Sequence, residues 1–495
     1  MSTASNIVVG SSESEWELVV GLEVHAQLIT ASKAYSSDPN MYGDHPNTNI
    51  SPITLGHPGT LPVLNKKVVE HAVRLGTAMH CTIAGPMHFA RKNYFYPDLP
   101  KGYQITQDKT PICTNGCILI PNGDGDKRVG ITRIHMEEDA GKSIHDVDPF
   151  NTLIDLNRAG VPLLEIVSEP DIRSGEEAYN YLVEIRRLVR YLDICDGNME
   201  EGSLRCDANI SVRRKGDERF GTRTEVKNMN SFRNVQRAIA FEAQRQVRIL
   251  ENGGTIHMET RTFDAAKGIT IGMRSKELAH DYRYFPEPDL APLVLTEKDV
   301  ERLTKDMPPL PRELRSKYTQ VLNLSAYDAE VLTDDRDTAL YFEAVIGLTK
   351  NHKAAANWVM GEVRAWVNQH GSPISEIPIG PERIAQLIDL IDSGKVSHSI
   401  ASQRLFPAML AEPGTSPEML AQRMDLIQER NEAPVQEAMR AAMERYPDKV
   451  KAYREGNKGL LGLFMGEVMK ATKGKADPKH ANMLVKRLLE ETPEI

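Results

Sequence analysis

The chain has 495 residues, of which 40% are hydrophobic and 26% charged, as in a globular protein with about three domains and more than one core. Its formal net charge of −9 argues against a chain that coats nucleic acid over its whole surface, although one basic face is compatible with that charge. Five cysteines exclude a disulfide framework and suit a reducing cytoplasm, and no apolar run approaches the roughly 18 residues of a membrane span.

The predicted elements change in kind near residue 295. Before that point, strand patterns alternate with Gly- and Pro-rich loops and with two helical patterns, at 176–193 and from about Ser231 to Leu250. Helical patterns dominate from about 296 to 405. The segment AEPGTSPE (411–418) then reads as a linker before a last helical set.

These patterns predict an α+β protein in three domains. They are a mixed α/β body on an antiparallel-rich sheet, an all-helical middle domain and a small helical tail domain, at residues 1–295, 296–410 and 411–495. The tail is basic, because between Tyr446 and Leu489 Lys and Arg number ten and Asp and Glu four, a local charge of +6. Such a charge is compatible with contacts to nucleic-acid phosphates.

Four stretches have the alternating or β-branched pattern of strands, at 19–28, 128–137, 203–213 and 222–228. Successive side chains of a strand point to opposite faces. Three of these strands therefore have polar faces that carry acids: Glu23, His25 and Gln27; Arg205, Asp207, Asn209, Ser211 and Arg213; and Arg223, Glu225 and Lys227. If the strands are neighbours, their sheet has one apolar face and one face lined with charge.

Two interpretations of the charged faces remain open. In one, the faces meet water, as one side of an antiparallel sheet often does. In the other, the acids and the histidine bind a divalent cation, because Mg²⁺ takes oxygen ligands at roughly 2.1 Å, among them carboxylates and substrate phosphates. Converging carboxylates repel a phosphate that carries no metal. If the face is functional, it therefore binds a metal ion and a nucleotide together.

The acidic turn HMEEDAGKS (135–143) also has two interpretations. Its acids either bind a divalent ion or are simply solvated. Its Gly-Lys-Ser end is similar to a phosphate-binding loop, but that motif requires Gly at the position of Met136. The strand-like EIVSEPD (165–171) adds Glu165, which alone fits a structural role as well as a functional one.

Signals for other chemistry are weaker. The segment FARKNYFYPDLPKGYQITQ (89–107) interleaves aromatic and basic residues, which suit either stacking on a nucleic-acid end or the packing of a long ordered loop. Cys113 and Cys117 have no second pair with ligand spacing, so zinc is not expected and their role stays open. No Gly-x-Ser-x-Gly elbow or other local nucleophile signature occurs, so no hydrolytic centre is visible.

Longer strings carry a resemblance to a known family. They are VGLEVHAQL, RKNYFYPDLPKGYQITQ, HMEEDAGKS, DLNRAGVPLLEIVSEPDIRS, EEGSLRCDANISVR and HDYRYFPEPD. In this order they resemble the B subunit of the glutamyl-tRNA(Gln)/aspartyl-tRNA(Asn) amidotransferase. The resemblance spans the whole chain, is densest from about 19 to 290, and continues through ANWVMG (356–361) to GLFMGEVMKATKGKADP (462–478).

This resemblance implies one subunit of a cytoplasmic heterotrimeric ligase that forms a carbon–nitrogen bond on a misacylated tRNA for translation. In the family, an amidase subunit releases ammonia from glutamine and a small subunit straps the complex together. The B subunit activates the side-chain carboxylate on the tRNA with ATP and Mg²⁺, and Mn²⁺ is a possible substitute. The family fold is a cradle-like body, a helical domain and a tail domain that grips the tRNA.

The resemblance also implies site residues. The metal-binding set corresponds here to Glu23, His25, Glu138, Glu165 and Glu225. The expected catalytic residues are Glu23, His25, Glu138 and Glu225, and to them we add Asp207, Asn209 and Lys227, whose roles we infer from the shared polar strand faces rather than from the resemblance. For the tRNA grip, we expect phosphate contacts by Lys470, Lys473, Lys475 and Lys479 of the basic tail.

One alternative belongs to another class: a non-catalytic scaffold that binds tRNA, with structural acids and the chemistry on a partner. The acids on three strands favour activation of the carboxylate on this chain. The sequence leaves open whether the acyl group is glutamyl, aspartyl or both, because the two differ by a single methylene.

Overall fold

The computed structural model describes residues 15–123, 125–275, 282–427, 432–472, 476 and 478–491. The chain divides into two compact units, Met1–Pro311 and Arg312–Ile495. Helix α4 (Glu297–Thr304) belongs to the first unit because it packs against α1 (Lys66–Ala78), where Arg74 Nε donates a hydrogen bond to Leu303 O over 2.9 Å. The division into three domains at 295 and 410 stays a prediction.

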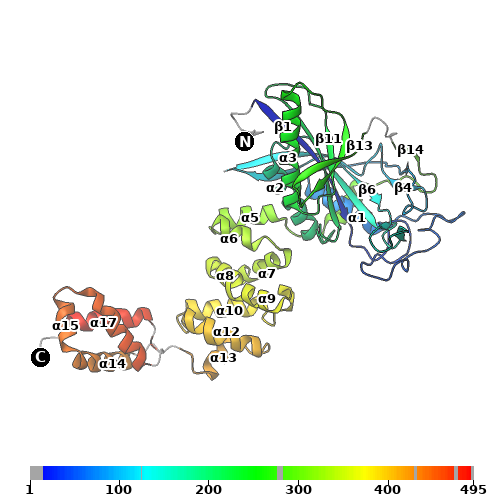
Figure 1. Cartoon of the computed structure of the whole chain (residues 1–495). Helices are drawn as coiled ribbons and strands as arrows, with labels where there is room; N and C mark the ends of the chain where they lie inside the picture. The colour runs from blue at the N-terminus through cyan, green and yellow to red at the C-terminus, as the bar shows by residue number, and fades with distance from the viewer. Residues whose placement is uncertain are drawn as a thin grey trace. The chain divides into compact units, whose positions relative to one another are not determined.

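The first unit is built on a nine-stranded sheet in the order β13-β12-β11-β10-β1-β9-β6-β5-β2 (Figure 1). Its strands in chain order are β1 (Trp16–Gln27), β2 (Thr82–Ile83), β5 (Cys113–Asn122), β6 (Gly125–Glu138), β9 (Pro162–Ser168), β10 (Leu204–Arg214), β11 (Thr224–Lys227), β12 (Glu259–Asp264) and β13 (Ile269–Ser275). Every neighbouring pair is antiparallel except β11 and β12. The expected α+β class with an antiparallel-rich sheet is confirmed.

One face of this sheet is apolar because alternate residues of its strands are apolar, and Leu22 at the centre of β1 is fully buried. Helices α1, α2 (Gly175–Tyr191) and α3 (Phe232–Glu251) contribute many of the other side chains of that core. Ser174 and Ser231 begin α2 and α3, and each side chain accepts a hydrogen bond from a backbone N–H of the first turn. The apolar face is thus occupied by packing, which leaves the polar face for chemistry.

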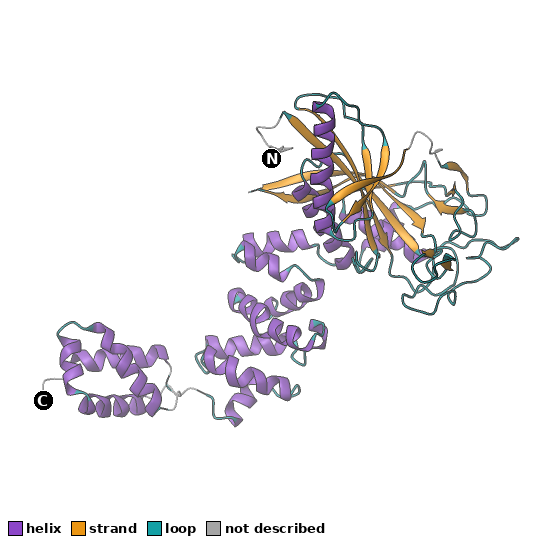
Figure 2. Cartoon of the chain, viewed as in Figure 1, coloured by secondary structure: helices purple, strands orange, loops and turns teal. Residues whose placement is uncertain are grey.

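A small sheet and a hairpin complete the first unit (Figure 2). The small sheet has the order β14-β3-β4, formed by Arg283–Pro286, Ala90–Asn93 and Tyr103–Thr106. Strands β7 (Lys142–Ile144) and β8 (Leu153–Asp155) pair in the hairpin. The segment of interleaved aromatic and basic residues therefore forms two strands of the small sheet and the turn between them.

The second unit is helical. Its helices are α5 (Pro311–Gln320), α6 (Ala326–Leu332), α7 (Arg336–Ile346), α8 (His352–Trp358), α9 (Arg364–His370), α10 (Pro381–Asp392), α11 (His398–Ile400), α12 (Phe406–Ala411), α13 (Pro417–Arg423), α14 (Glu432–Arg445), α15 (Pro447–Arg454), α16 (Leu461–Ala471) and α17 (Pro478–Glu491). Helices α14 to α17 share a hydrophobic cluster that includes Phe464 and Val485. Among the helices of the described residues, none is both long enough and apolar enough to cross a membrane.

Candidate metal and nucleotide site

Strand register brings the polar side chains of the large sheet together. Glu23 of β1 lies opposite Asp207 of β10, and His25 lies opposite Glu165 of β9. Strand β11 pairs with the other edge of β10 and brings Glu225 to the same face. One polar face therefore runs continuously over β11, β10, β1, β9 and β6.

Glu23, Asp207 and Glu225 form what we call the carboxylate cluster, because one oxygen of each lies within 4.8 Å of the others. Lys227 Nζ contacts Asp207 and lies 3.1 Å from Glu225 Oε1. Asn209 Nδ2 donates a hydrogen bond to Glu23 Oε1 over 2.8 Å. All five residues belong to the set expected from the sequence, and the structure brings them to one place.

Negative charges lie close together in the carboxylate cluster. Burial raises the pKa of Glu23, and the charges of Glu165, Asp207 and Glu225 raise it further. Burial would lower the pKa of Lys227, but Asp207 and Glu225 outweigh that effect and hold the pKa above its ordinary value. The carboxylates of the cluster thus repel one another, and a divalent cation bound there would offset that repulsion.

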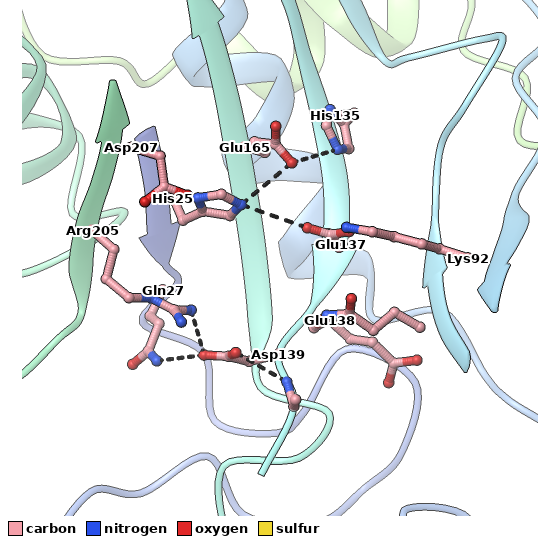
Figure 3. Close-up of polar contacts among 12 residues, drawn as sticks. His25, Gln27, Lys92, His135, Glu137, Glu138, Asp139, Glu165, Arg205 and Asp207 are labelled. Atoms are coloured by element: carbon pink, nitrogen blue, oxygen red, sulfur yellow. Dashed lines mark hydrogen bonds and ion pairs between the residues drawn. The ribbon is translucent and has the colours of Figure 1, made fainter. Parts of the chain in front are cut away.

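His25, Glu137 and Glu165 form a second group, which we call the histidine cluster (Figure 3). His25 Nε2 lies 3.3 Å from Glu165 Oε2 and 3.8 Å from Glu137 Oε2. His135 Nε2 reaches the same Glu165 oxygen at 3.1 Å, and Lys92 Nζ lies 3.2 Å from Glu137 Oε1. Each carboxylate of the cluster therefore has nitrogen partners from other strands.

Charges within the histidine cluster outweigh the effect of burial. Burial would raise the pKa of Glu165, but His135 and His25 hold that pKa well below its usual range. Burial would lower the pKa of His25, but its hydrogen bond to Glu165 and the charges of Glu165 and Glu137 raise it above its ordinary value. The cluster thus keeps an ionised carboxylate beside an imidazole that readily holds a proton.

Asp139, the residue after β6, organises the end of the polar face (Figure 3). Its Oδ2 accepts hydrogen bonds from Gln27 Nε2 over 2.9 Å and from Arg205 over 2.6 Å, and Arg158 Nε lies 3.6 Å away. Burial would raise the pKa of Asp139, but the two guanidinium groups hold it below its usual range. Asp139 therefore fixes Arg205, which lies opposite His25 in the β1–β10 pair.

Glu138 lies on the other face of β6, turned away from His25 (Figure 3). Its carboxylate contacts Lys101 and accepts a hydrogen bond from Ile105 N over 2.8 Å, so it belongs to neither cluster. The adjacent Glu137 takes part in the histidine cluster instead. Glu137 was not among the residues selected from the sequence. Extending the strand alternation to the end of β6 would have placed Glu137 on the polar face.

The expected tRNA contacts are only partly described. Lys470 is exposed near the end of α16, whereas Lys473 and Lys475 lie outside the described residues, as does the side chain of Lys479.

Cys113 is buried on β5, where its Sγ lies 3.5 Å from Ala72 O, and it is a free thiol like Cys117. Neither cluster found among the described residues contains a cysteine.

A groove of about 510 Å³ adjoins the carboxylate cluster, a volume within the roughly 300–1,000 Å³ of small-molecule sites. Gly21 and Glu23 of β1 and Asn209 of β10 line it, and the segment Phe220–Arg223 adds further lining. Glycine inside a strand often marks a place where a ligand approaches the backbone. Gly21 therefore supports a ligand site in the groove.

The two clusters suit different ions. The carboxylate cluster offers only oxygens, the ligands that Mg²⁺ prefers. The histidine cluster adds an imidazole nitrogen, which softer divalent ions accept more readily than Mg²⁺ does. Burial and the neighbouring carboxylates raise the pKa of Glu23, and a cation bound at the carboxylate cluster would counter both effects.

Comparison with known proteins covers almost the whole chain. Residues 18–301 match the GatB/GatE catalytic domain, and residues 340–489 match the GatB domain. The chain is 50% identical over 475 residues to the B subunit of the aspartyl/glutamyl-tRNA(Asn/Gln) amidotransferase of Chlorobium phaeobacteroides (strain BS1), which covers 96% of this chain and 99% of the relative. For its counterpart from Synechococcus sp. (strain JA-3-3Ab), the identity is 49% over 489 residues, with 98% of this chain and 99% of the relative covered. For that of Thermodesulfovibrio yellowstonii, it is 47% over 477 residues, with 96% and 100% covered.

The sheet and its polar face thus form a catalytic domain of the GatB/GatE class. The chain belongs to the family of aspartyl/glutamyl-tRNA(Asn/Gln) amidotransferase B subunits. The resemblance found in the sequence is confirmed.

Proposed function

We propose that this chain phosphorylates the side-chain carboxylate of glutamyl-tRNA(Gln), aspartyl-tRNA(Asn) or both, so that ammonia can convert it into an amide. The relatives are named as aspartyl/glutamyl-tRNA(Asn/Gln) amidotransferase subunits, which supplies the substrate class. The observation that carries the proposal is the continuous polar face, which holds both clusters and where the carboxylate cluster adjoins a groove of small-molecule size.

Activation is required because a carboxylate and ammonia exchange a proton rather than form an amide, and hydroxide is a poor leaving group. In the first step, a carboxylate oxygen attacks the γ-phosphorus of ATP, the bond to the β,γ-bridging oxygen breaks, and ADP leaves with the electron pair. The nitrogen of ammonia then attacks the acyl carbon and loses a proton, and phosphate leaves with the electrons of the carbon–oxygen bond. The first step depends mainly on positioning and charge neutralisation.

We assign ATP to the groove. Its Glu23 end adjoins the carboxylate cluster, so phosphates at that end would lie near Lys227. Arg223 at the groove is exposed, and the described residues supply no ion-pair partner for it, so its guanidinium is available to a phosphate. Gly21 leaves space above β1 for the nucleoside.

Glu23, Asp207 and Glu225 would hold the divalent cation, with Asn209 orienting Glu23 and Lys227 orienting the other two carboxylates. When bound, Mg²⁺, or Mn²⁺ in its place, would supply charge neutralisation for the phosphates.

The histidine cluster would serve the second step. Glu165 and Glu137 orient the His25 imidazole, whose raised pKa suits it to hold the proton that ammonia releases. Arg205, fixed by Asp139 opposite His25, adds a cation beside the departing phosphate.

Ammonia has to come from a partner, because no local nucleophile signature for glutamine hydrolysis occurs in the sequence. A glutamine-hydrolysing amidase subunit would supply it, with a small third subunit completing a cytoplasmic heterotrimer. The basic tail, which includes the exposed Lys470, would hold the tRNA. The alternative is a scaffold that binds tRNA while the chemistry takes place on a partner.

The test uses the assembled complex with glutamate-charged tRNA(Gln), ATP labelled on the γ-phosphate, limiting Mg²⁺ and an ammonium salt in place of glutamine. Glu225→Gln removes one charge from the carboxylate cluster with little change of shape. We expect an intact complex that has lost at least about tenfold in amidation and in release of labelled phosphate, since even partners of metal ligands usually cost about 10–100-fold. Mn²⁺ binding, followed by electron paramagnetic resonance, should weaken in parallel.

The matched control is Glu418→Gln, which removes an exposed glutamate paired with Lys395 in the second unit. It should leave both measurements unchanged. If Glu225→Gln and Glu23→Gln complexes amidate at the wild-type rate under limiting Mg²⁺, the chemistry lies on a partner and the scaffold alternative is correct.

A further inference from the structure

Four tyrosines gather at one face of the small sheet, and we call this group the aromatic wall: Tyr94, Tyr96, Tyr282 and Tyr284. Tyr284 of β14 lies opposite Lys92 of β3, and Tyr282 and Tyr94 occur two residues away on their segments, on the same face. The rings of Tyr94 and Tyr282 are in edge contact with centroids 5.4 Å apart, and those of Tyr94 and Tyr96 are 5.8 Å apart.

Three of the four tyrosines of the aromatic wall are exposed, and Tyr94 is half-buried. Tyr96 exposes 56% of its surface, Tyr282 47% and Tyr284 40%. Packing of the segment is achieved on the opposite face of the small sheet, where Arg91 lies 4.3 Å from the ring of Tyr103. The aromatic wall is therefore not required for that packing, and its exposed rings are available to a ligand.

Lys92 joins the aromatic wall to the histidine cluster. Its Nζ lies 4.9 Å from the ring centre of Tyr282 and 3.2 Å from Glu137 Oε1. Burial would lower the pKa of Lys92, but the charge of Glu137 outweighs that effect and keeps the ammonium protonated at this place. The side chain of Lys92 alone would therefore separate a ligand stacked on Tyr282 from the histidine cluster.

We propose that the aromatic wall binds the 3′-terminal adenosine of the aminoacyl-tRNA by stacking. This inference rests on the proposed function and adds the place where the charged end of the substrate docks. The reacting carboxylate is joined to the terminal nucleoside only through the short aminoacyl group. When the carboxylate reaches the polar face, the terminal base must therefore lie close by, and exposed tyrosine rings bind bases by stacking.

The adenine base of ATP also stacks on tyrosine rings, so ATP is a second candidate ligand for the aromatic wall. The groove assigned to ATP lies at the Glu23 end of the polar face, and none of the four tyrosines of the aromatic wall lines it. The aromatic wall contacts Glu137 through Lys92, at the histidine cluster. The two adenosines would thus bind at different places, with their reacting groups meeting over the polar face.

The test compares Tyr282→Leu and Tyr96→Leu with the aromatic control Tyr282→Phe, in the assembled complex. The probe is 3′-glutamylamino-3′-deoxyadenosine, a stable amide analogue of the charged end, used as a competitor of glutamyl-tRNA(Gln) in ammonium-driven amidation. A second probe has the same aminoacyl ribose without the base. We expect wild type and Tyr282→Phe to bind the first probe about tenfold more tightly than the second, as one stacked base would provide.

Both leucine variants should lose most of this preference for the base, with KM for ATP unchanged. Within the aromatic wall, Tyr96 contacts Tyr94, whereas Lys92 contacts Tyr282, so Tyr96→Leu separates stacking from the cation contact that Lys92 makes with Tyr282. A full preference for the base in both leucine variants would overturn the inference, and so would a rise in KM for ATP without loss of probe binding. Failure of the proposed function is distinct, because the Glu225→Gln complex would then amidate normally, whatever the probes show.

Discussion

His25 Nε2 lies 3.3 Å from Glu165 Oε2, across a strand pair whose members are far apart in the sequence. The contact exists because β9 lies between β1 and β6 in the sheet. The same Glu165 oxygen also meets His135 Nε2 at 3.1 Å. One ionised carboxylate thus joins two imidazoles, and any change of charge at Glu165 alters both.

This contact predicts energetic coupling between His25 and Glu165. We expect His25→Asn and Glu165→Gln each to lower kcat/KM for ammonium-driven amidation. Because each change already breaks the shared contact, the double variant should have a kcat/KM only slightly below that of the less active single variant. The non-additivity should reach about 1 kcal/mol, as for residues in contact. The measurement is a double-variant cycle on the assembled complex. Glu165→Gln combined with Lys353→Met, an exposed residue of the second unit, should be additive, and additivity in the first pair would contradict the proposed cluster.

Gly21 and Gly221 both line the groove, but they tolerate side chains differently. A Cβ at Gly21 would meet only ordinary contacts, 3.8 Å from Ser168 O and 3.9 Å from Pro170 Cα. We therefore expect Gly21→Val to fold normally, since a β-branched residue suits a strand, and to raise KM for ATP about tenfold, or about 1.4 kcal/mol, by filling the groove. Steady-state kinetics with ATP as the varied substrate would measure this effect.

A Cβ at Gly221 would lie 2.2 Å from Val212 O, a backbone atom. Gly221→Ala should consequently lower the midpoint of thermal unfolding, which Gly21→Val should not. An unchanged KM for ATP in a well-folded Gly21→Val complex would remove ATP from the groove.

His71 predicts a pH dependence of stability. It is 2% exposed on α1, and its Nε2 lies 3.2 Å from Ile29 O. Burial lowers the pKa of His71 to about 4, the hydrogen bond to Ile29 O and the charge of Glu70 oppose the shift, and the charges of Lys67 and Arg74 add to it. The unfolded chain, with a pKa near 6.5, binds the proton first, so the stability from this residue is complete above pH 6.5 and is lost as pH falls towards 4.

The loss amounts to at most about 3 kcal/mol at pH 4. Urea unfolding between pH 4 and 7 should therefore depend less on pH for His71→Gln than for wild type. His57→Gln, which replaces an exposed histidine, is the matched control and should follow wild type. Parallel pH profiles for wild type and His71→Gln would contradict the assignment.

Strand alternation predicted much of the candidate site. The two-residue period assigns Glu23 and His25 to one face of β1, and Asp207 and Asn209 to one face of β10, whatever the neighbours of these strands are. The structure gathers these residues because β1 and β10 are adjacent and in a register that sets Glu23 opposite Asp207. Adjacency of distant strands is a tertiary property that periodicity does not encode.

The residues that sequence reasoning missed depend on such long-range pairing. Glu137 and Glu138 were indistinguishable as members of an acidic turn, and only the continuation of β6 to Glu138 decides which of them faces His25. Lys92 joins the histidine cluster from a different sheet, so no local pattern pointed to it. The aromatic and basic segment was recognised, but its two faces became distinct only when β14 paired with β3.

The basic tail predicts salt-dependent binding of tRNA. Changing Lys470, Lys473, Lys475 and Lys479 to Gln removes four positive charges, and the removal of each phosphate-binding charge should lower the slope of log affinity against log salt by about 0.9 on duplex regions. Filter binding of tRNA to the assembled complex between low and physiological salt would measure the slope.

Changing the exposed Lys66, Lys267, Lys298 and Lys305 of the first unit to Gln is the charge-matched control. We expect the tail variant to raise KM for the charged tRNA and to keep the turnover rate at saturating tRNA, because the residues proposed to activate the carboxylate belong to the first unit. Equal slopes for the two variants would mean that the tRNA is held elsewhere on the complex.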